Sequence, residues 1–427
     1  MIEQTPDTRS SYDWNAMIRA EDGLVNRRIF IEPEVYQVEL EKIFARTWLY
    51  LCHESQLKNP GDFFTTYMGD DPVLVTRDKS GKIGAFLNSC RHRGMKVCRA
   101  DEGNTAAFTC SYHAWTYGPD GKLIGVPTFK EAYFEELDRG QWGLIPVPRI
   151  ESYCGLIFGC WDPDVVPLTE YLGDATYYMD IMFNRRAGGT EVIGGTHKWS
   201  MGCNWKFAAD NFVGDFYHVQ YTHGSAMGPG ATADIMERMT EVSPKDGHGL
   251  GIQVRKPEQR VSRSSNGTPT IVDEYMDSIK PEMRERLGDE RADTLWPVHA
   301  TIFPNMSFGG NGLLRVWLPR GPERMEVWSW VCVDKDAPDD VKQAVMRGCQ
   351  YAFNATGMFE QDDGENWSQC TEATRGFIAR QQDFNYQMGL GHEETMETQP
   401  GRRGGGAPYS ELGQRGFYKF YRDLMAG

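Results

Sequence analysis

The segments Cys90-Arg-His92-Arg-Gly94 and Cys110-Ser-Tyr-His113-Ala-Trp115-Thr-Tyr117 each contain one cysteine close to one histidine. Both pairs lie within 24 residues of the chain. A cysteine supplies an anionic sulfur ligand and a histidine a neutral nitrogen ligand, so the pairs are typical of a metal site with mixed ligands. Glycine and aromatic residues flank both pairs, as expected for two tight loops that close over one metal group.

Two metal groups accept this ligand set. A tetrahedral zinc site takes two cysteines and two histidines, but zinc-finger spacings pair cysteine with cysteine and histidine with histidine. A Rieske [2Fe–2S] cluster holds one iron by two thiolates and the other by two imidazoles. The mixed pairs therefore favour a Rieske cluster and a role in electron transfer. Its predicted ligands are Cys90, His92, Cys110 and His113.

The flanking residues resemble the Rieske domain of the ring-hydroxylating oxygenases, whose pattern is C-x-H-R-G followed by C-x-Y-H-G-W-x-Y. Ala114 stands where this family usually has glycine, a change that restricts the loop backbone without threatening ligation. Met95 and Tyr112 occupy positions at which respiratory-chain Rieske proteins have bridging cysteines. The resemblance therefore implies a low-potential, ferredoxin-type cluster.

Composition excludes several classes of protein. The chain of 427 residues has 40% hydrophobic and 25% charged residues, which predicts a globular protein with two domains. Its formal charge of −15 argues against a nucleic-acid partner. The sequence has neither a long apolar run nor a signal peptide, so we expect a cytoplasmic protein without membrane contact. The scattered cysteines suit a reducing compartment and predict no disulfides.

Locally, the sign of the charge reverses. The first cluster loop carries four cations: Arg91, Arg93, Lys96 and Arg99. They form either an ordinary solvated surface or a docking patch for an acidic electron donor.

Short alternating runs broken by turn residues predict an all-β module around the cluster pairs. Asp78–Gly81 and Gly118–Gly121 are expected to form turns. The predicted strands include Asp62–Tyr67, Pro72–Arg77, Lys82–Asn88 and Tyr153–Gly159.

Outside this module, helical spacing alternates with strands. Apolar residues at helical spacing predict helices over Pro33–Arg46 and Pro338–Phe353, and Arg324–Val333 reads as a strand. The glycine-rich Gly401–Pro408 is expected to be a loop. The expected fold class is α+β. The resemblance implies that residues 1–46 form a helical N-terminal part of the catalytic domain, 47–166 the Rieske domain and 167–427 the catalytic domain.

A second group of polar residues lies in Asn204–His223. If this segment is one helix, Asn211 and Asp215 share a face, and so do Asp215 and His218. His223 then lies about 140° around the helix from His218. Convergence of both histidines on one metal therefore requires the helix to bend, unwind or end just before His223.

Two imidazoles and one carboxylate form the facial triad of non-haem Fe(II) oxygenases, which leaves positions open for O2 and substrate. The carboxylate is missing from the histidine segment. Further along, Phe359–Trp367 resembles the catalytic segment of the aromatic-ring dioxygenases, in which the second aspartate of a pair binds iron. The resemblance implies the ligands His218, His223 and Asp363, with Asp362 as the alternative.

In the D-x-x-H-x-x-x-x-H pattern of this family, the aspartate does not bind iron. By resemblance, Asp215 links the iron-bound His218 to the cluster ligand His113 of a neighbouring subunit, and Asn211 lies beside it at the catalytic site. A carboxylate accepts one N–H from each imidazole and so orients both rings. The resemblance therefore implies a ring of subunits, α3 or α3β3.

Pocket walls are inferred from position along the chain: Asn211, Phe212, Val219, His299 and Phe359. They are mostly apolar, and we find no arginine near the ligands that would hold a substrate carboxylate. A hydrocarbon, bicyclic or larger, is favoured over a benzoate. The glycine-rich stretch from Gly224 to Gly267 is expected to be a mobile rim or a surface insertion.

The resemblance extends over most of the chain, and the naphthalene-dioxygenase-like large (α) subunits are nearest. It implies an inserted Rieske domain and a curved antiparallel sheet covered by helices, of the helix-grip type. One [2Fe–2S] cluster and one Fe(II) per chain would receive electrons from NADH through a reductase and a ferredoxin, and a small β subunit is expected. The product would be a cis-dihydrodiol. The alternatives are a Rieske monooxygenase or demethylase, a dioxygenase of an aromatic carboxylate, and an electron carrier without catalytic iron.

Overall fold

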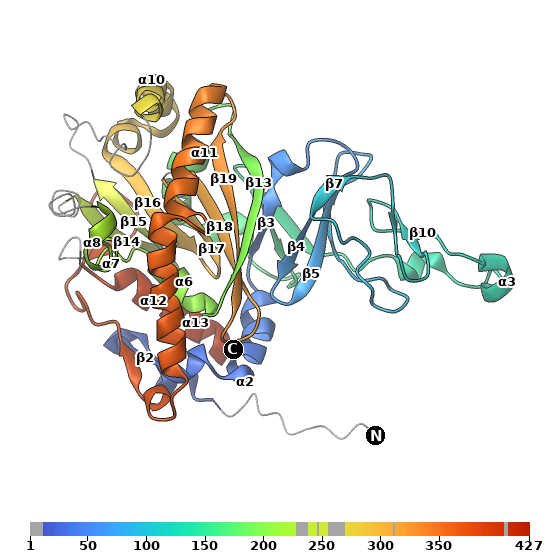
Figure 1. Cartoon of the computed structure of the whole chain (residues 1–427), viewed down its shortest axis with the longest axis horizontal. Helices are drawn as coiled ribbons and strands as arrows, with labels where there is room; N and C mark the ends of the chain where they lie inside the picture. The colour runs from blue at the N-terminus through green and yellow to red at the C-terminus, as the bar shows by residue number, and fades with distance from the viewer. Residues whose placement is uncertain (1–11, 228–237, 246, 255–269, 311, 405–408) are drawn as a thin grey trace. The chain divides into compact units, whose positions relative to one another are not determined.

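The computed structural model describes residues 12–227, 238–245, 247–254, 270–310, 312–404 and 409–427. Contacts within the chain divide it into two compact units (Figure 1). One unit comprises Phe44–Leu168, and the other comprises Met1–Ile43 together with Thr169–Gly427. We call them the Rieske unit and the catalytic unit. Within the described residues, no helix is long and apolar enough to cross a membrane.

The Rieske unit is built from three small antiparallel sheets. The expected turns are present, since Gly81 N donates to Asp78 O at 3.0 Å and Gly121 N donates to Gly118 O at 2.9 Å. In sheet order, the strands are β6 (Ile83–Leu87), β5 (Asp71–Arg77), β4 (Asp62–Met68) and β7 (Glu102–Asn104); β11 (Arg149–Tyr153), β12 (Leu156–Cys160) and β3 (Leu49–His53); and β10 (Leu123–Gly125), β9 (Thr116–Tyr117) and β8 (Phe108–Thr109). One α-helix, α3 (Phe129–Tyr133), and two short 3-10 helices, Glu54–Gln56 and Arg139–Trp142, complete the unit.

One expectation about this unit is wrong: Tyr153–Gly159 is not a single strand. Tyr153 ends β11 and Leu156 begins β12, and the two strands pair antiparallel. Cys154 (φ 50°) and Gly155 (φ 85°) form the turn between them. Left-handed backbone at two successive residues reverses the chain, and a continuous apolar run does not reveal this.

The catalytic unit contains a long antiparallel sheet with helices α11 (Asp339–Phe353) and α12 (Met358–Thr374) packed over it (Figure 1). Among the described residues, the sheet has nine strands. In order, they are β13 (Thr190–Met201), β19 (Met325–Asp334), β18 (Leu313–Pro319), β17 (Met306–Gly309), β16 (Leu295–Ile302), β15 (His248–Val254), β14 (Met239–Lys245), β22 (Arg402–Gly404) and β21 (Glu393–Thr395). A small separate sheet joins β1 (Ile18–Arg19), β2 (Leu24–Asn26) and β20 (Asp383–Asn385).

Two expectations about irregular segments change. Residues 402–404 of the expected loop Gly401–Pro408 form strand β22, which pairs with β14 and β21. The expected rim between Gly224 and Gly267 lies largely outside the described residues, but its described part supplies β14 and β15 of the main sheet. Both segments form strands because they pair with other strands of the sheet. The glycine content of a segment does not predict such pairing.

Helix α11 (Asp339–Phe353) shows why the helices form where the sequence predicts them. Asp339 and Asp340 lie in its first turn, where carboxylates interact favourably with the helix dipole. Its buried residues recur at helical spacing and face the sheet. The other helices are α1 (Trp14–Met17), α2 (Pro33–Glu39), α4 (Leu168–Leu172), α5 (Ala175–Phe183), α6 (Trp205–Asn211), α7 (Val219–Thr222), α8 (Gly224–Met227), α10 (Thr270–Leu287), α12 (Met358–Thr374) and α13 (Leu412–Ala426).

The buried carboxylate of Glu39 ties three of these helices together. Glu39 ends α2 and accepts hydrogen bonds from Lys206 Nζ (2.5 Å) and Trp205 Nε1 (3.0 Å) of α6 and from Tyr421 OH (2.6 Å) of α13. Lys206 is fully buried, and its burial lowers the pKa of the ammonium group while Glu39 acts in the opposite direction. The N-terminal segment is therefore an integral part of the catalytic unit.

Replacing Glu39 by alanine should destabilise the catalytic unit by about 3–5 kcal/mol, because it leaves the Lys206 ammonium buried without its counter-charge. Thermal unfolding followed by circular dichroism should show a clearly lower midpoint. Glu34→Ala, at an exposed position of the same helix, is the control and should change stability by no more than about 0.5 kcal/mol. Equal midpoints for the two variants would contradict this role of Glu39.

The two loops that carry the mixed pairs have the same backbone hydrogen bonds. Gly94 N donates to Cys90 O at 2.8 Å, and Ala114 N donates to Cys110 O at 2.8 Å. In each loop, the residue four positions after the cysteine has left-handed backbone, with φ of 77° at Gly94 and 55° at Ala114. The alanine at the position where the family usually has glycine is therefore strained, by about 1–2 kcal/mol.

Ala114→Gly should stabilise the Rieske unit by about 0.5–1 kcal/mol, because glycine adopts this backbone without strain and loses only part of the gain to its freer unfolded state. The loss of visible cluster absorbance on heating measures the effect. Ala106→Gly is the control, since Ala106 is exposed and its φ is not left-handed, and it should stabilise nothing. A lower transition temperature for Ala114→Gly would refute the strain.

Candidate functional site

The side chains of the two mixed pairs lie together at the ends of their loops. The Cys90 and Cys110 side chains are buried, and the His92 and His113 rings have centroids 4.5 Å apart. The Tyr117 hydroxyl lies 3.3 Å from Cys90 Sγ and accepts a hydrogen bond from Arg91 N. His92 Nδ1 is buried without a hydrogen-bond partner in the protein. Two sulfurs and two imidazoles held in this way fit a Rieske cluster.

The segment Asn204–His223 is not one helix. Asn211, Asp215 and His218 therefore share no helical face, but their side chains still lie together. Helix α6 ends at Asn211, and Gly214 has a φ of 133°. A Cβ at Gly214 would lie 2.6 Å from Glu241 Cγ and 3.0 Å from Leu250 O, so only glycine fits there. The close packing of this turn on β14 and β15 ends the helix.

The interruption of the helix allows His218 and His223 to converge although they are five residues apart in the chain. The one-turn helix α7 lies between His218 and His223, which flank it on either side. Their rings therefore leave the chain at the two ends of a short turn, and their centroids are 5.2 Å apart. The expectation that the helix bends, unwinds or ends just before His223 is confirmed, because α7 ends at Thr222.

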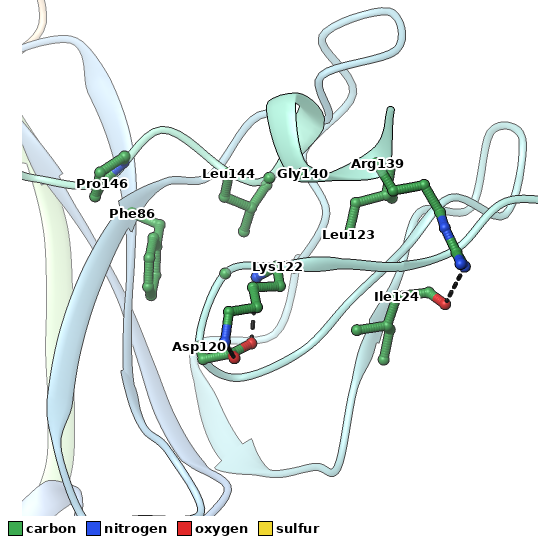
Figure 2. Close-up of a pocket in the computed structure, with 11 residues that line it drawn as sticks. Phe86, Asp120, Lys122, Leu123, Ile124, Arg139, Gly140, Leu144 and Pro146 are labelled. Carbon is green, nitrogen blue, oxygen red and sulfur yellow. Dashed lines mark hydrogen bonds and ion pairs between the residues drawn. The ribbon is translucent and has the colours of Figure 1, made fainter. Parts of the chain in front are cut away.

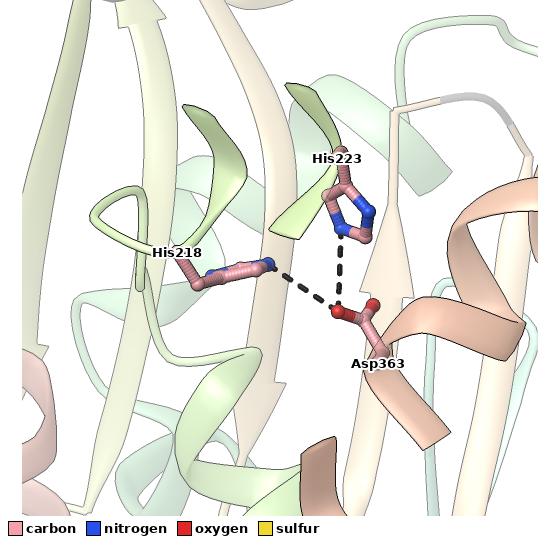
Figure 3. Close-up of side chains that lie close together, drawn as sticks. All are labelled: His218, His223 and Asp363. Carbon is pink, nitrogen blue, oxygen red and sulfur yellow. Dashed lines mark ion pairs between the residues drawn. The ribbon is translucent and has the colours of Figure 1, made fainter. Parts of the chain in front are cut away.

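Asp363 from helix α12 meets both imidazoles (Figure 3). Asp363 Oδ1 lies 3.5 Å from His218 Nε2 and 3.2 Å from His223 Nε2, and one ligand atom from each residue lies within 4.8 Å of the others. This oxygen is buried without a hydrogen-bond donor. Two imidazole nitrogens around a desolvated carboxylate oxygen fit a mononuclear iron.

Asp362 faces the other side of His223. Its Oδ2 lies 3.3 Å from His223 Nδ1, and its side chain is more exposed than that of Asp363. A carboxylate at Nδ1 orients the ring while Nε2 points to the centre of the group. This geometry favours Asp363 over Asp362 as the third ligand.

Asp215 holds His218 in the same manner. Asp215 Oδ2 lies 3.2 Å from His218 Nδ1, and Asp215 Oδ1 accepts a hydrogen bond from Tyr217 N at 2.9 Å. Burial acts to raise the pKa of Asp215, but His218 outweighs it and the pKa is lowered. Asn211 Nδ2 lies 3.3 Å from both Asp215 Oδ2 and His218 Nδ1. Asn211 and Asp215 therefore orient one imidazole together.

The residues inferred to line a pocket belong to a group of aromatic and apolar side chains beside the histidines, which we call the aromatic wall. Phe359 lies 4.9 Å from His223 between ring centroids, and His299 lies 5.7 Å from Phe212. Val219 packs against the buried Phe216. Burial lowers the pKa of His299 to about 4, so this imidazole is neutral at pH 7.

Sequence reasoning missed two members of this wall, Phe216 and Phe353. Phe216 lies 4.9 Å from His299, and Phe353 lies 5.6 Å from Phe359 and 6.5 Å from Phe212. Phe353 is the last residue of α11, where helical periodicity marks only the end of a helix. The sequence feature that could have identified Phe353 is its position, one loop before α12.

A separate hollow of about 610 Å³ lies in the Rieske unit (Figure 2). Apolar residues such as Phe86, Leu123 and Leu144 line it, and the ion pair of Asp120 with Lys122 (2.9 Å) lies at its edge. None of its lining residues belongs to the predicted ligands or pocket walls.

Comparisons with known proteins agree with these two sites. Residues 47–149 match the Rieske [2Fe–2S] domain, and residues 168–427 match the catalytic domain of the ring-hydroxylating α subunits. The chain is 42% identical over 419 residues to the benzene 1,2-dioxygenase α subunit of Pseudomonas putida, which covers 94% of this chain and 91% of the relative.

Two further relatives extend the comparison. The biphenyl 2,3-dioxygenase α subunit of Rhodococcus jostii is 42% identical over 418 residues, with 94% of this chain and 89% of the relative covered. The crystal structure of naphthalene 1,2-dioxygenase from Rhodococcus sp. bound to indole superposes with a TM-score of 0.87 at 37% identity, covering 99% of this chain and 98% of that one. The chain therefore belongs to the α subunits of the aromatic ring-hydroxylating dioxygenases, which carry a Rieske [2Fe–2S] cluster and a mononuclear iron.

Proposed function

We propose that this α subunit adds both atoms of O2 to adjacent carbons of a neutral aromatic hydrocarbon, giving a cis-dihydrodiol, with His218, His223 and Asp363 holding the iron. The observation that carries the proposal is the convergence of two imidazole nitrogens on a buried carboxylate oxygen that has no donor in the protein. When bound, the iron supplies the activation of O2. Cys90, His92, Cys110 and His113 hold the cluster in this proposal.

The surrounding residues orient the ligands and the substrate. Asp215 and Asp362 each lie at the Nδ1 side of one histidine and leave its Nε2 for the iron. Phe212, Phe353 and Phe359 supply aromatic faces that position a flat ring. His299 is neutral and adds no charge to this wall.

The charge of the pocket favours a hydrocarbon over an aromatic carboxylate. Arg315 is the cation close to Phe212 and Phe353, but it is fully buried and paired with Glu360 at 2.7 Å. It is therefore not presented to a substrate carboxylate. The relatives named for benzene, biphenyl and naphthalene act on neutral hydrocarbons, which supports the same substrate class.

Oxygenase α subunits of this family work with reductase, ferredoxin and β subunits. For this chain, we place ferredoxin docking on Arg93, Lys96 and Arg99, which are exposed beside the cluster loop. Arg91 is different, because it donates to Gly143 O at 3.1 Å and stacks over Trp142. Reduction would pass from NADH through the reductase to ferredoxin, in the cytoplasm.

The proposed assembly is a ring of three α subunits, with or without β subunits, in which Asp215 of one subunit accepts a hydrogen bond from His113 of the next. Both ends of this bridge have exposed aromatic surface. Tyr112, 59% exposed, lies against His113, and Tyr217 and Tyr221, 48% and 70% exposed, flank His218 in the sequence. Exposed aromatic residues of this kind are enriched at protein interfaces.

Incubation with the donor proteins, NADH and ¹⁸O2 should convert naphthalene or biphenyl to a cis-dihydrodiol that carries two labelled oxygens. Mass spectrometry of the product measures this. A product with one labelled oxygen would indicate a monooxygenase and overturn the proposed reaction, and formaldehyde released from an O-methylated aromatic offered in their place would indicate a demethylase.

Iron analysis tests the ligand assignment. The wild-type chain should contain three irons, and Asp363→Ala should contain two, with the visible spectrum of the cluster unchanged, because only the mononuclear site loses a ligand. Asp362→Ala should keep three, because Asp362 orients His223 without binding the metal. Two irons in the wild type would indicate an electron carrier, and the reverse result for the two aspartates would make Asp362 the ligand.

Asp215→Ala should retain three irons and a reducible cluster but lose about 10–100-fold in turnover, because the bridge between the metal sites is missing. Single-turnover oxidation of the reduced cluster by O2 in the presence of substrate measures the transfer step. Asp164→Ala, at an exposed position of the Rieske unit, is the control. Normal turnover in Asp215→Ala would exclude the bridging role.

A further inference from the structure

A fully buried arginine, Arg315, lies within the sheet of the catalytic unit. It belongs to β18, between Ser307 of β17 and Ser329 of β19. Its Nη1 donates to Glu360 Oε2 at 2.7 Å, and its Nη2 donates to Phe353 O at 2.9 Å. One guanidinium group therefore binds both α11 and α12 from the sheet below them.

The stability of the fold does not explain this ion pair. Removal of a guanidinium and a carboxylate from water costs several kcal/mol for each group, and well-packed apolar residues often replace such pairs without loss of stability. All residues of β18 are buried, so an apolar side chain would suit this strand. In some proteins a buried pair is retained because it fixes geometry, and the contacts of Arg315 fit that role.

The geometry that Arg315 fixes is that of the aromatic wall. Its guanidinium carbon lies 5.3 Å from the ring centroid of Phe212 and 5.8 Å from that of Phe353. Trp317 and Trp199 enclose it at 4.9 and 5.8 Å. A planar guanidinium stacks on such rings and donates in two fixed directions, whereas a lysine ammonium does neither.

Both hydrogen bonds act on residues next to the site. Phe353 ends α11, and its carbonyl is one that the helix itself leaves without a donor, at the end where a cation is favoured. Glu360 follows Phe359, whose ring lies 4.9 Å from His223 and 5.6 Å from Phe353. The relative positions of Phe212, Phe353 and Phe359 therefore depend on one side chain.

We propose that Arg315 is a positioning residue that determines which ring bond of the substrate is oxidised, by fixing the three aromatic rings against the iron ligands. The inference rests on the proposed iron site and hydrocarbon substrate. Arg315 contacts neither substrate nor iron. It acts through Phe353 and through Glu360, and its loss allows a flat substrate to bind in more than one orientation.

The test compares Arg315→Lys with the wild-type oxygenase, supplied with its electron donors and with biphenyl or phenanthrene as substrate. Both substrates have several non-equivalent ring bonds. Chromatography gives the ratio of dihydrodiol isomers, and metal analysis gives the iron content. Arg185→Lys is the matched control, because Arg185 forms another buried pair, with Asp334 at 2.9 Å, and has no contact with the aromatic wall in the described part of the chain.

We expect Arg315→Lys to retain three irons and to change the isomer ratio by about tenfold, the lower end of the effect that a changed contact in an apolar pocket has on discrimination. Arg185→Lys should leave the ratio unchanged. Glu360→Gln, which keeps the size of the side chain and removes its charge, is the second variant and should change the ratio in the same sense.

An unchanged ratio in both Arg315→Lys and Glu360→Gln, with three irons present, would overturn the inference. Loss of the mononuclear iron in both variants would also overturn it, because the pair would then support the metal site itself. Failure of the proposed function is separate from either result, since it would show as absence of dihydrodiols or of the third iron in the wild-type protein.

Discussion

A carboxylate oxygen buried without a hydrogen-bond donor is the constraint on which the catalytic unit depends. An anion in such a position is unfavourable by several kcal/mol unless a cation or donors compensate it. Asp363 Oδ1 faces two imidazoles instead of donors, so the site is suited to a metal that supplies the missing positive charge. The surrounding structure has to hold three side chains from two distant segments in this arrangement.

Buried polar contacts away from the site provide that hold. Asp210, next to Asn211 at the end of α6, accepts hydrogen bonds from Tyr386 OH at 2.8 Å and Tyr418 OH at 2.5 Å. Burial raises the pKa of Asp210 to about 7. Glu39 and Lys206 fix the beginning of the same helix. Helix α6 is thus held at both ends, and the turn at Gly214 starts from a fixed point.

The cluster loops were predictable because their information is local. Each loop closes through a hydrogen bond between residues four apart. In each loop the predicted histidine ligand follows the predicted cysteine ligand by two or three residues. The strands and turns around them follow equally short patterns, and most were predicted correctly. The error at Tyr153–Gly159 has the same origin, since a reversal at Cys154 and Gly155 leaves the apolar pattern of the sequence intact.

The sequence by itself determined the ligand types, the order of the two metal sites and, through the resemblance, the family and its chemistry. Tertiary structure alone decided that α6 stops at Asn211, because the close packing of Gly214 against Glu241 and Leu250 involves residues far away in the chain. It also decided that Phe353 meets Phe212 and Phe359 and that Arg315 lies against Phe353. Spacing along a chain encodes which groups are available, whereas packing between distant segments sets which of them meet.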